Sequence, residues 1–264
     1  MPAQISFELP HAVAVSGAAS GLGLEICQLL VDNGVYTVGV DLTDAAAQLK
    51  EAHGYHHVSG DVTEETTWQA VVDRLKDSGY HSYGLVTSAA ILDVGLVTEN
   101  TKAQILRTFD VNVVGTALAM KALIPLMVET GGGSIVAVAS VNASFAEQQL
   151  ALYNASKAAV RQLARTAALD HARQGIRVNV LSPGAMMAGL FQRHLESAAD
   201  PDLFHKTRAK RQPVGRITSA RDVARAGLFL LSNGAGALIG SDIIADGGLT
   251  TSFDFRTGEE GASI

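Results

Sequence analysis

The chain contains one cysteine, Cys27, and six prolines in 264 residues. A single cysteine excludes an intramolecular disulfide framework and is typical of a reducing compartment. Prolines are few and glycines number 26, a balance that favours tight turns between regular elements over long linkers. Because Cys27 falls inside a predicted helix, we expect it to be a core residue rather than a nucleophile.

Charged residues are also sparse, at 17% of the chain, and the net charge is −6. This balance excludes a protein built to bind nucleic acid. Residues 1–10 have neither the basic segment nor the apolar run of a signal peptide. The most apolar later segment, residues 111–128, is interrupted by Asn112, Lys121 and Pro125, so it predicts a buried helix and no membrane span. We therefore expect a cytoplasmic protein.

The histidines give no sign of a metal site. His53, His56 and His57 lie together at a predicted helix-to-strand junction, and no cysteine or carboxylate cluster with ligand spacing lies near them. We interpret these histidines as surface residues and expect no bound metal.

Short apolar segments alternate with helical patterns along the chain, and hydrophobic residues make up 47% of it. Most predicted strands are apolar on both faces, which is typical of a parallel sheet covered by helices on both sides. We therefore predict a doubly wound, Rossmann-like α/β fold in a single domain, residues 1–264. The predicted strands are 11–16, 36–40, 55–60, 83–87, 134–139, 177–181 and 243–245. Helices are predicted from Thr43 or Asp44 to about His53 and over 101–129 and 151–174, and residues 182–218 are predicted to be irregular.

A glycine-rich turn with Gly17, Gly21 and Gly23 joins the first predicted strand to the first helix. Glycines let the backbone approach a pyrophosphate, and the helix N-terminus supplies N–H donors and a positive dipole. Ser20 and Leu22 belong to the same turn, so we count them among the residues that bind a dinucleotide.

Asp41 ends the second predicted strand, and its carboxylate can accept hydrogen bonds from the adenosine ribose while repelling a 2′-phosphate. No Lys or Arg stands in the glycine turn or at Leu42, where a partner for that phosphate would be expected. The predicted cofactor is therefore NAD, with Asp41 as a simple helix cap as the alternative. Asp61 and Val62 follow the third strand and are predicted to meet the adenine.

Tyr153 and Lys157 are spaced i, i+4, so they share one face of a predicted helix. An ammonium close to a phenol favours the phenolate and lowers the pKa of the phenol. Tyr153 could then exchange a proton with an alcohol oxygen, which Ser140, at the end of a strand, could hold. Taken alone, this spacing is also compatible with a chance pair.

Together these motifs resemble the short-chain dehydrogenase/reductase family over nearly the whole chain. The resemblance implies hydride transfer between a nicotinamide and a secondary alcohol or ketone, in a homotetramer paired through the two long helices. The residues that carry it are Gly17-x3-Gly21-x-Gly23, Asp61-Val62, Asn112, Ser140, Tyr153-x3-Lys157, Pro183-Gly184 and Asp246-Gly247-Gly248.

The resemblance also implies a catalytic tetrad of Asn112, Ser140, Tyr153 and Lys157. Tyr153 would be the acid/base and Ser140 would orient the substrate oxygen. Lys157 would hold the nicotinamide ribose and lower the pKa of Tyr153. Asn112 would support a water linked to Lys157, with a purely structural asparagine as the alternative. Further cofactor contacts are implied at Ala89, Pro183, Gly184 and Met186.

Two positions depart from the family's pattern. Thr87-Ser88-Ala89-Ala90 stands where the family usually has Asn-Asn-Ala-Gly, so the asparagine side-chain bonds that stiffen the sheet are missing. Ala188 replaces a threonine that bonds the carboxamide of the nicotinamide, so we expect backbone groups of Ala185 or Met186 to anchor it instead.

Two segments bear on the substrate, for which we predict a sugar acid, a sugar or a polyol. The loop before Tyr153 offers polar side chains, including Glu147, where a steroid or acyl-chain site would favour apolar ones. The usual lid of the family, about residues 185–218, carries a cationic surplus that suits an anionic substrate, although a solvated lid surface explains it equally well. The predicted substrate contacts are Ser140, Asn142, Gln148, Gln149, Tyr153, Met187 and Arg193.

A tail, residues 251–264, follows the family core. Phe253 and Phe255 would anchor it in a neighbouring subunit, where Arg256 would bind a substrate carboxylate; a disordered end or an interface clamp is the alternative. Two other functions stay open for the whole chain. They are a reductase of 3-oxoacyl or other apolar ketones, and a non-catalytic regulatory protein that binds a dinucleotide.

Overall fold

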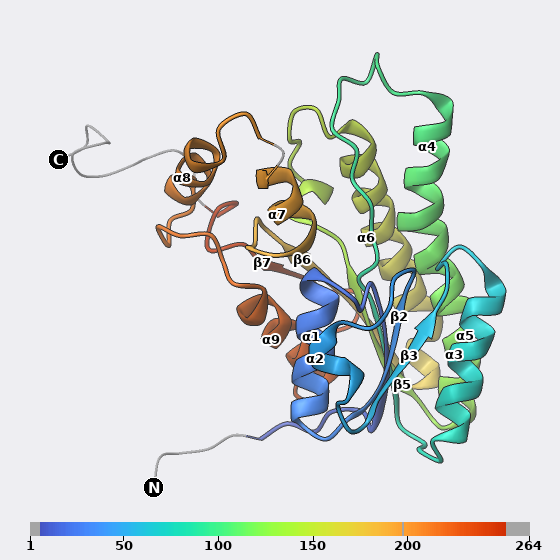
Figure 1. Ribbon diagram of the computed structural model, residues 1–264. Helices are drawn as coiled ribbons and strands as arrows, with labels where there is room; N and C mark the ends of the chain where they lie inside the picture. The colour runs from blue at the N-terminus through green and yellow to red at the C-terminus, as the bar shows by residue number, and fades with distance from the viewer. Residues whose placement is uncertain (1–5, 197, 252–264) are drawn as a thin grey trace, which may run out of the picture.

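The computed structural model describes residues 6–196 and 198–251, and in these residues seven parallel strands form one sheet (Figure 1). The strand order is β3-β2-β1-β4-β5-β6-β7. Neighbours β1 and β4 are therefore the point at which the strand order reverses, and α/β sheets bind ligands outside the carboxyl ends of the strands at such a point. The strands are β1 (Ala12–Ser16), β2 (Tyr36–Asp41), β3 (Tyr55–Ser59), β4 (Tyr83–Thr87), β5 (Gly133–Val138), β6 (Ile176–Pro183) and β7 (Asp242–Ala245).

Alternate residues of the central strands pack on opposite faces of the sheet. Ala12 and Ala14 of β1 contribute to one core, and Val13 and Val15 contribute to the other. Helices cover both faces, as Figure 1 shows, so the predicted doubly wound α/β fold is confirmed. On the first face lie α3 (Glu65–Asp77), α4 (Lys102–Phe109), α5 (Gly115–Glu129) and α6 (Ala151–His171); on the second lie α1 (Gly21–Asp32), α2 (Ala47–Lys50) and α9 (Ala220–Leu231).

The segment Lys102–Glu129 is long and apolar enough to span a membrane by length and composition. Its side chains instead enter the protein core, where Leu123 and Met127 are fully buried against the sheet. This segment is the core helix that the polar interruptions predicted. Cys27 is likewise a buried core residue, as expected, and Trp68 is also buried.

Three predicted elements differ from the structure. The helix expected over 101–129 is divided by a π-helical turn, Asp110–Val114, which widens the helix at Asn112. The helix expected from Thr43 or Asp44 to about His53 is reduced to α2. The amide and hydroxyl of Thr43 donate to Asp41, so residues 41–43 form a turn and the helix begins only at Ala47. Residues 182–218 are not irregular, since they contain α7 (Gly189–Glu196) and α8 (Pro201–Arg211), the latter capped by the Asp200 side chain.

Candidate active site

The glycine turn lies between β1 and α1 at the carboxyl end of the sheet. Gly17 and Gly21 have φ angles of 70° and 58°, which favour glycine. A Cβ on Gly17 would lie 2.9 Å from the Ala89 backbone, and one on Gly23 would lie 2.2 Å from the Gly17 carbonyl oxygen. Close packing therefore requires glycine at both positions and leaves a bare backbone cradle at the start of α1, which fits a pyrophosphate.

Asp41 faces the same turn from the end of β2. Its Oδ2 atom accepts a hydrogen bond from the Ala19 amide at 3.1 Å, and its Oδ1 atom accepts from the amide and hydroxyl of Thr43 at 3.0 Å each. The carboxylate thus connects the glycine turn to the turn after β2, and it does not cap α2. This is the placement expected of a group that meets the adenosine ribose.

Asp61 lies beside this region, and its Oδ2 atom is 3.5 Å from the Nη1 atom of Arg107 on α4. Burial alone would raise the pKa of Asp61, but hydrogen bonds from Thr63 and the charge of Arg107 outweigh it and hold the pKa below its usual value. Both side chains line the cavity. A carboxylate held in its charged form is therefore available to accept hydrogen bonds at this end.

Tyr153 and Lys157 lie one turn apart on α6, and the Nζ atom of Lys157 is 5.7 Å from the centroid of the Tyr153 ring. Lys157 is buried and donates to the Val138 carbonyl oxygen at 2.8 Å. Ser140, at the end of β5, hydrogen-bonds the Tyr153 side chain and accepts from the Asn142 amide at 3.1 Å. The three side chains predicted from the motif are thus brought together around one cavity.

The pKa values of this pair differ from expectation. Burial raises the pKa of Tyr153 to about 12, the hydrogen bond with Ser140 opposes that rise, and the charge of Glu147 adds to it. Burial also lowers the pKa of Lys157 to about 8. The expected lowering of the Tyr153 pKa is therefore wrong for this structure, because burial outweighs the favourable hydrogen bond with Ser140.

Asn112 lies in the π-helical turn but does not line the cavity. Its Oδ1 atom accepts from the Ile91 amide at 2.8 Å, and its Nδ2 atom donates to the Ile91 carbonyl at 3.0 Å and to the Ser156 hydroxyl at 2.9 Å. The side chain therefore joins the segment after β4 to α6. In this structure it bonds the neighbours of Lys157, and its role in supporting a water stays a prediction.

The departures from the family's pattern have visible consequences. The buried Thr87 hydroxyl has no hydrogen-bond partner among the described residues, whereas the Ser16 hydroxyl accepts from the amides of Ser88 and Ala89 at 3.1 and 3.2 Å. Ser16 thereby holds the segment that an asparagine side chain would otherwise stiffen. On the opposite side, the Thr218 hydroxyl donates to the Ala185 carbonyl at 2.8 Å, which fixes the backbone beside Ala188.

The loop before α6 forms one wall of the cavity. The Asn142 Nδ2 atom donates to Glu147 at 3.3 Å and to Asn154 at 3.0 Å. Both N–H donors of this side chain are therefore already hydrogen-bonded within the protein. Gln149 has a φ of 64°, unusual for a residue other than glycine, and its carbonyl oxygen accepts from the Gly95 amide at 2.9 Å. Gln148 and Gln149 both line the cavity.

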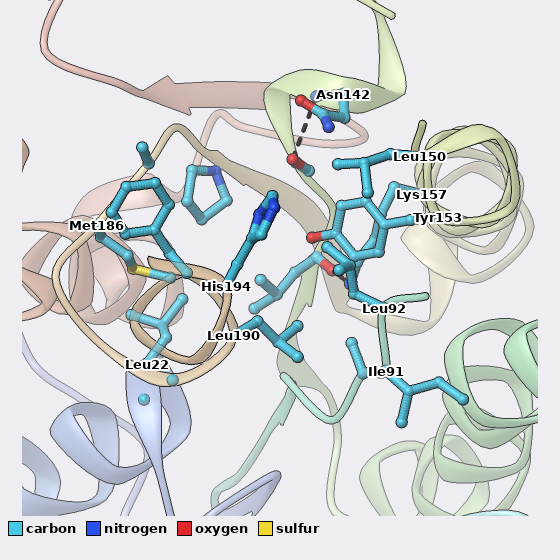
Figure 2. A pocket seen from close by; sticks show the side chains of 18 of the residues that line it. Leu22, Ile91, Leu92, Asn142, Leu150, Tyr153, Lys157, Met186, Leu190 and His194 are labelled. Atoms are coloured by element: carbon cyan, nitrogen blue, oxygen red, sulfur yellow. Dashed lines mark hydrogen bonds between the residues drawn. The ribbon is translucent and has the colours of Figure 1, made fainter. Parts of the chain in front are cut away.

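The lid helices α7 and α8 close the opposite wall. Arg208 of α8 forms an ion pair with Glu147 and lies 4.9 Å over the ring of Phe204. Figure 2 shows His194 and Leu190 of α7 pointing toward the part of the cavity that holds Tyr153. Basic and apolar side chains of the lid therefore face the proposed acid/base together.

The cavity has a volume of about 1070 Å³ and takes in both the glycine turn and Tyr153. Three predicted site residues do not line it. Gly23 is turned into the packing between α1 and β1, Asn112 lies behind α6, and the exposed Met187 pairs its backbone with Thr218 instead. Arg256, with Phe253 and Phe255, lies outside the described residues. The predicted residues that line the cavity are Gly17, Ser20, Gly21, Leu22, Asp41, Asp61, Val62, Ala89, Ser140, Asn142, Gln148, Gln149, Tyr153, Lys157, Pro183, Gly184, Met186 and Arg193.

Sequence reasoning missed an apolar part of this cavity. Leu92, Leu150 and Leu190 line it near Tyr153, and Figure 2 shows them around the phenol. Leu92 lies in the segment after β4, and a place after the carboxyl end of a parallel strand is a sequence signal for a site residue. Leu150 carries no signal beyond its place three residues before Tyr153. Within the described residues, no group of three or more His, Cys, Asp or Glu side chains is arranged to hold a metal ion.

The fold and this site define an oxidoreductase that uses a nicotinamide dinucleotide. The family model described as "Enoyl-(Acyl carrier protein) reductase" matches residues 17–250. The cis-4-hydroxycyclohexanecarboxylate dehydrogenase of Sinomonas cyclohexanicum is 34% identical over 250 residues, which are 91% of this chain and 96% of that protein. The chain belongs to the short-chain dehydrogenase/reductase family and is a dehydrogenase of that family.

Solved structures agree with this assignment. The aldohexose dehydrogenase of Thermoplasma acidophilum superimposes with a TM-score of 0.86 at 30% identity, covering 95% of this chain and 98% of that one. The gluconate 5-dehydrogenase of Burkholderia cenocepacia, solved with NADP and tartrate, has a TM-score of 0.83 at 27% identity and covers 92% of this chain and 96% of its own. The relatives thus act on sugars, a sugar acid and a cyclic hydroxy acid.

Proposed function

We propose that the chain is an NAD-dependent dehydrogenase of a small secondary alcohol that carries a carboxylate. In this proposal Tyr153 takes the hydroxyl proton, Ser140 holds the same oxygen, and Lys157 binds the nicotinamide ribose. The nicotinamide supplies the hydride acceptor when it is bound. The observation that carries the proposal is the shared cavity, in which Tyr153, Ser140 and Lys157 adjoin the glycine cradle.

The proposed preference for NAD rests on Asp41. Its carboxylate is held toward the glycine turn by the Ala19 amide, where a 2′-phosphate would meet a negative charge. Leu42 and Ser20 beside it carry no positive charge, and both line the cavity. The gluconate 5-dehydrogenase noted above was solved with NADP, so the preference between NAD and NADP is inferred from the residues of each chain. The backbone of Ala185 and Met186 is proposed to hold the carboxamide, since Ala188 has no hydroxyl.

The proposed substrate class follows from the lid and the apolar wall. Arg193, Arg208 and Arg211 line the cavity against a single carboxylate of the loop, Glu147. This cationic surplus favours a substrate carboxylate, which arginine can bind through two parallel hydrogen bonds. Leu92, Leu150 and Leu190 favour an apolar ring or chain beside the reacting carbon.

Two carbon frames satisfy this description, a sugar acid and an alicyclic hydroxy acid. Polar Gln148 and Gln149 support the sugar acid, and the three leucines support the alicyclic frame. The names of the relatives are consistent with either, since one acts on a hydroxycyclohexanecarboxylate and another on gluconate. Both frames share the carboxylate and the secondary alcohol, which are the parts that the proposal requires.

A substrate panel tests this function. NADH formation would be followed with gluconate, cis-4-hydroxycyclohexanecarboxylate, cyclopentanol and an aldohexose, each with NAD. We expect the highest kcat/KM with one of the two carboxylates, and Arg208→Gln should lower kcat/KM for that carboxylate more than for cyclopentanol. Equal or better oxidation of cyclopentanol would refute the carboxylate and favour the apolar alternative, and equal or better oxidation of the aldohexose would refute the carboxylate in favour of a neutral sugar.

We also propose that the chain works as a homotetramer in the cytoplasm. Val114 and Val128 on the π-helical turn and α5, and Leu169 on α6, are large apolar side chains exposed to solvent in one chain, with Leu169 at 75% exposure. Pairing through these helices would bury them. Light scattering at micromolar concentration should give the mass of four chains, and a monomer would contradict this proposal.

A further inference from the structure

His57 makes two hydrogen bonds at the β3 edge of the sheet, although the sequence indicated a surface residue. Its Nε2 atom lies 2.9 Å from the carbonyl oxygen of Thr43, and its Nδ1 atom lies 3.1 Å from the hydroxyl of Tyr55. Tyr55 and His57 are two residues apart on β3, so their side chains lie on the same face as α1 and α2. Figure 1 shows α2 beside α1 on that face.

The polarity of these bonds follows from the groups. A carbonyl oxygen only accepts, so the proton of the neutral imidazole lies on Nε2, and Nδ1 then accepts from the Tyr55 hydroxyl. Tyr55 is a buried phenol whose pKa is raised by burial and by nearby Cys27 and Asp41, so it remains a donor. The chain of bonds therefore runs from Tyr55 through His57 to the Thr43 carbonyl.

Gly39 makes room for this arrangement. It is paired with His57 across β2 and β3, and a Cβ at Gly39 would lie 2.1 Å from the Tyr55 hydroxyl oxygen and 2.8 Å from the Ala18 Cβ. The phenol therefore crosses β2 directly behind the glycine turn. Its hydroxyl hydrogen-bonds His57 and not the glycine turn itself.

Thr43 is the point at which these bonds meet the cofactor site. Its amide and hydroxyl both donate to Asp41, whose other oxygen accepts from Ala19 of the glycine turn. Thr43 is exposed and begins no helix, so few other contacts hold its carbonyl. Through the Thr43 carbonyl, His57 thus anchors the turn that orients the Asp41 carboxylate.

We propose that His57, supported by Tyr55, is a positioning residue for the adenosine ribose of the cofactor. It holds the turn of residues 41–43 so that Asp41 is oriented toward the ribose hydroxyls before the dinucleotide binds. Preorganisation of this kind strengthens binding because the ordering cost is met in the free protein. The inference rests on the proposed use of NAD.

The test compares three substitutions with a matched control. His57→Leu removes both hydrogen bonds, His57→Gln keeps an amide donor within reach of the Thr43 carbonyl, and Tyr55→Phe removes only the hydroxyl. His56→Leu is the control, because His56 lies on the same strand with its ring on the other face, stacked on Tyr36 at 4.4 Å. For each purified variant, Kd values for NADH and NADPH would be measured by fluorescence titration, with kcat at saturating NAD.

The expected result is a Kd for NADH raised roughly three- to tenfold in His57→Leu, the equivalent of one hydrogen bond. Tyr55→Phe should show a smaller rise, and His57→Gln and His56→Leu should stay near the unaltered value. Binding of NADPH should change less than that of NADH, and kcat should be unchanged. If His57→Leu does not fold, Tyr55→Phe and His57→Gln carry the comparison. NADH bound as tightly by His57→Leu and Tyr55→Phe as by the unaltered chain would overturn the proposal.

A second measurement separates this inference from the choice of cofactor. Backbone amide exchange in the ligand-free protein should be faster at Thr43 and Ala19 in His57→Leu than in His56→Leu. An unaltered chain that fails to bind NADH would refute the cofactor proposal, whereas exchange at Thr43 would still report on the anchor. Equal exchange in the two variants would overturn the anchoring role.

Discussion

Glu147 and Arg208 form an ion pair that joins the loop before α6 to α8 of the lid. Glu147 also accepts from Asn142 through its carboxylate, and through its carbonyl oxygen from Asn154 at 3.0 Å. Because Asn154 follows Tyr153 directly on α6, Glu147 connects the lid, through its carboxylate, to the helix of the proposed acid/base, through its carbonyl oxygen. The charge of the Glu147 carboxylate also contributes to the raised pKa of Tyr153.

Glu147→Gln should therefore move the pH profile of alcohol oxidation to lower pH. Burial is the main cause that raises the pKa of Tyr153 to about 12, and the charge of Glu147 adds to it. Oxidation needs the phenolate, so its rate rises as the pH passes through this pKa. Removing a negative charge stabilises the phenolate and lowers the pKa. The measurement is kcat/KM for oxidation against pH at saturating NAD.

Arg208→Gln is the control for that prediction, because it leaves the Glu147 carboxylate in place without its ion-pair partner. Its profile should stay where it is or move to higher pH. A Glu147→Gln profile that coincides with that of the unaltered chain, or lies above it in pH, would show that the carboxylate does not act on Tyr153.

The destabilisation of the folded protein by buried, charged Lys157 should decrease as the pH rises. Burial lowers its pKa from 10.5 to about 8, so between these values the unfolded chain binds more protons than the folded one. The free energy of unfolding then rises with pH in that range, by up to about 3 kcal/mol for 2.5 pKa units. Urea unfolding of the unaltered chain and of Lys157→Met would be compared between about pH 7 and pH 10.

The raised pKa of Tyr153 acts in the opposite sense, with loss of stability as the pH passes above 10, but it is present in both proteins and cancels in the comparison. We expect the unaltered chain to gain stability relative to Lys157→Met over this range. A constant or falling difference would mean that Lys157 keeps its proton in the folded protein.

Asp41→Ala should narrow the preference for NAD over NADP. The substitution removes the carboxylate proposed to bind the ribose diol and to repel a 2′-phosphate. Asp41→Asn is the companion variant, since it keeps one acceptor oxygen, for either Thr43 or Ala19, while losing the charge. The ratio of kcat/KM values for the two cofactors is the readout. An unaltered chain that uses NADP equally well would contradict the role of Asp41.

The sequence could predict the fold because its information was local. Unbroken apolar runs such as Ala12–Ser16 are buried on both faces, and that pattern has few solutions other than a covered parallel sheet. The glycine turn and the spacing of Tyr153 and Lys157 were also local patterns, and the structure brings them to one cavity. Cross-strand relationships, such as Gly39 beside Tyr55, were not readable because they depend on register.

The remaining differences depend on the folded environment of each side chain, namely its hydrogen-bond partners and its burial, which spacing along the sequence does not reveal. Glu147 and Asn154 accept from the Nδ2 group of Asn142, a pairing that the sequence did not reveal, and its contact with the substrate stays a prediction. His57 appeared to be a surface residue, but Tyr55 and Thr43 bind both of its nitrogens. The pKa of Tyr153 depends on burial, which the i, i+4 spacing does not reveal.

The most direct test of the proposed function is NADH formation by Tyr153→Phe, measured beside its Kd for NADH. The phenol ring is kept, so we expect a Kd close to that of the unaltered chain. Turnover of the preferred hydroxy acid should fall about 100- to 10,000-fold, the usual contribution of a general acid/base. A Tyr153→Phe protein that binds NADH normally and turns over at nearly the original rate would contradict the assignment of Tyr153, and with it the proposed mechanism.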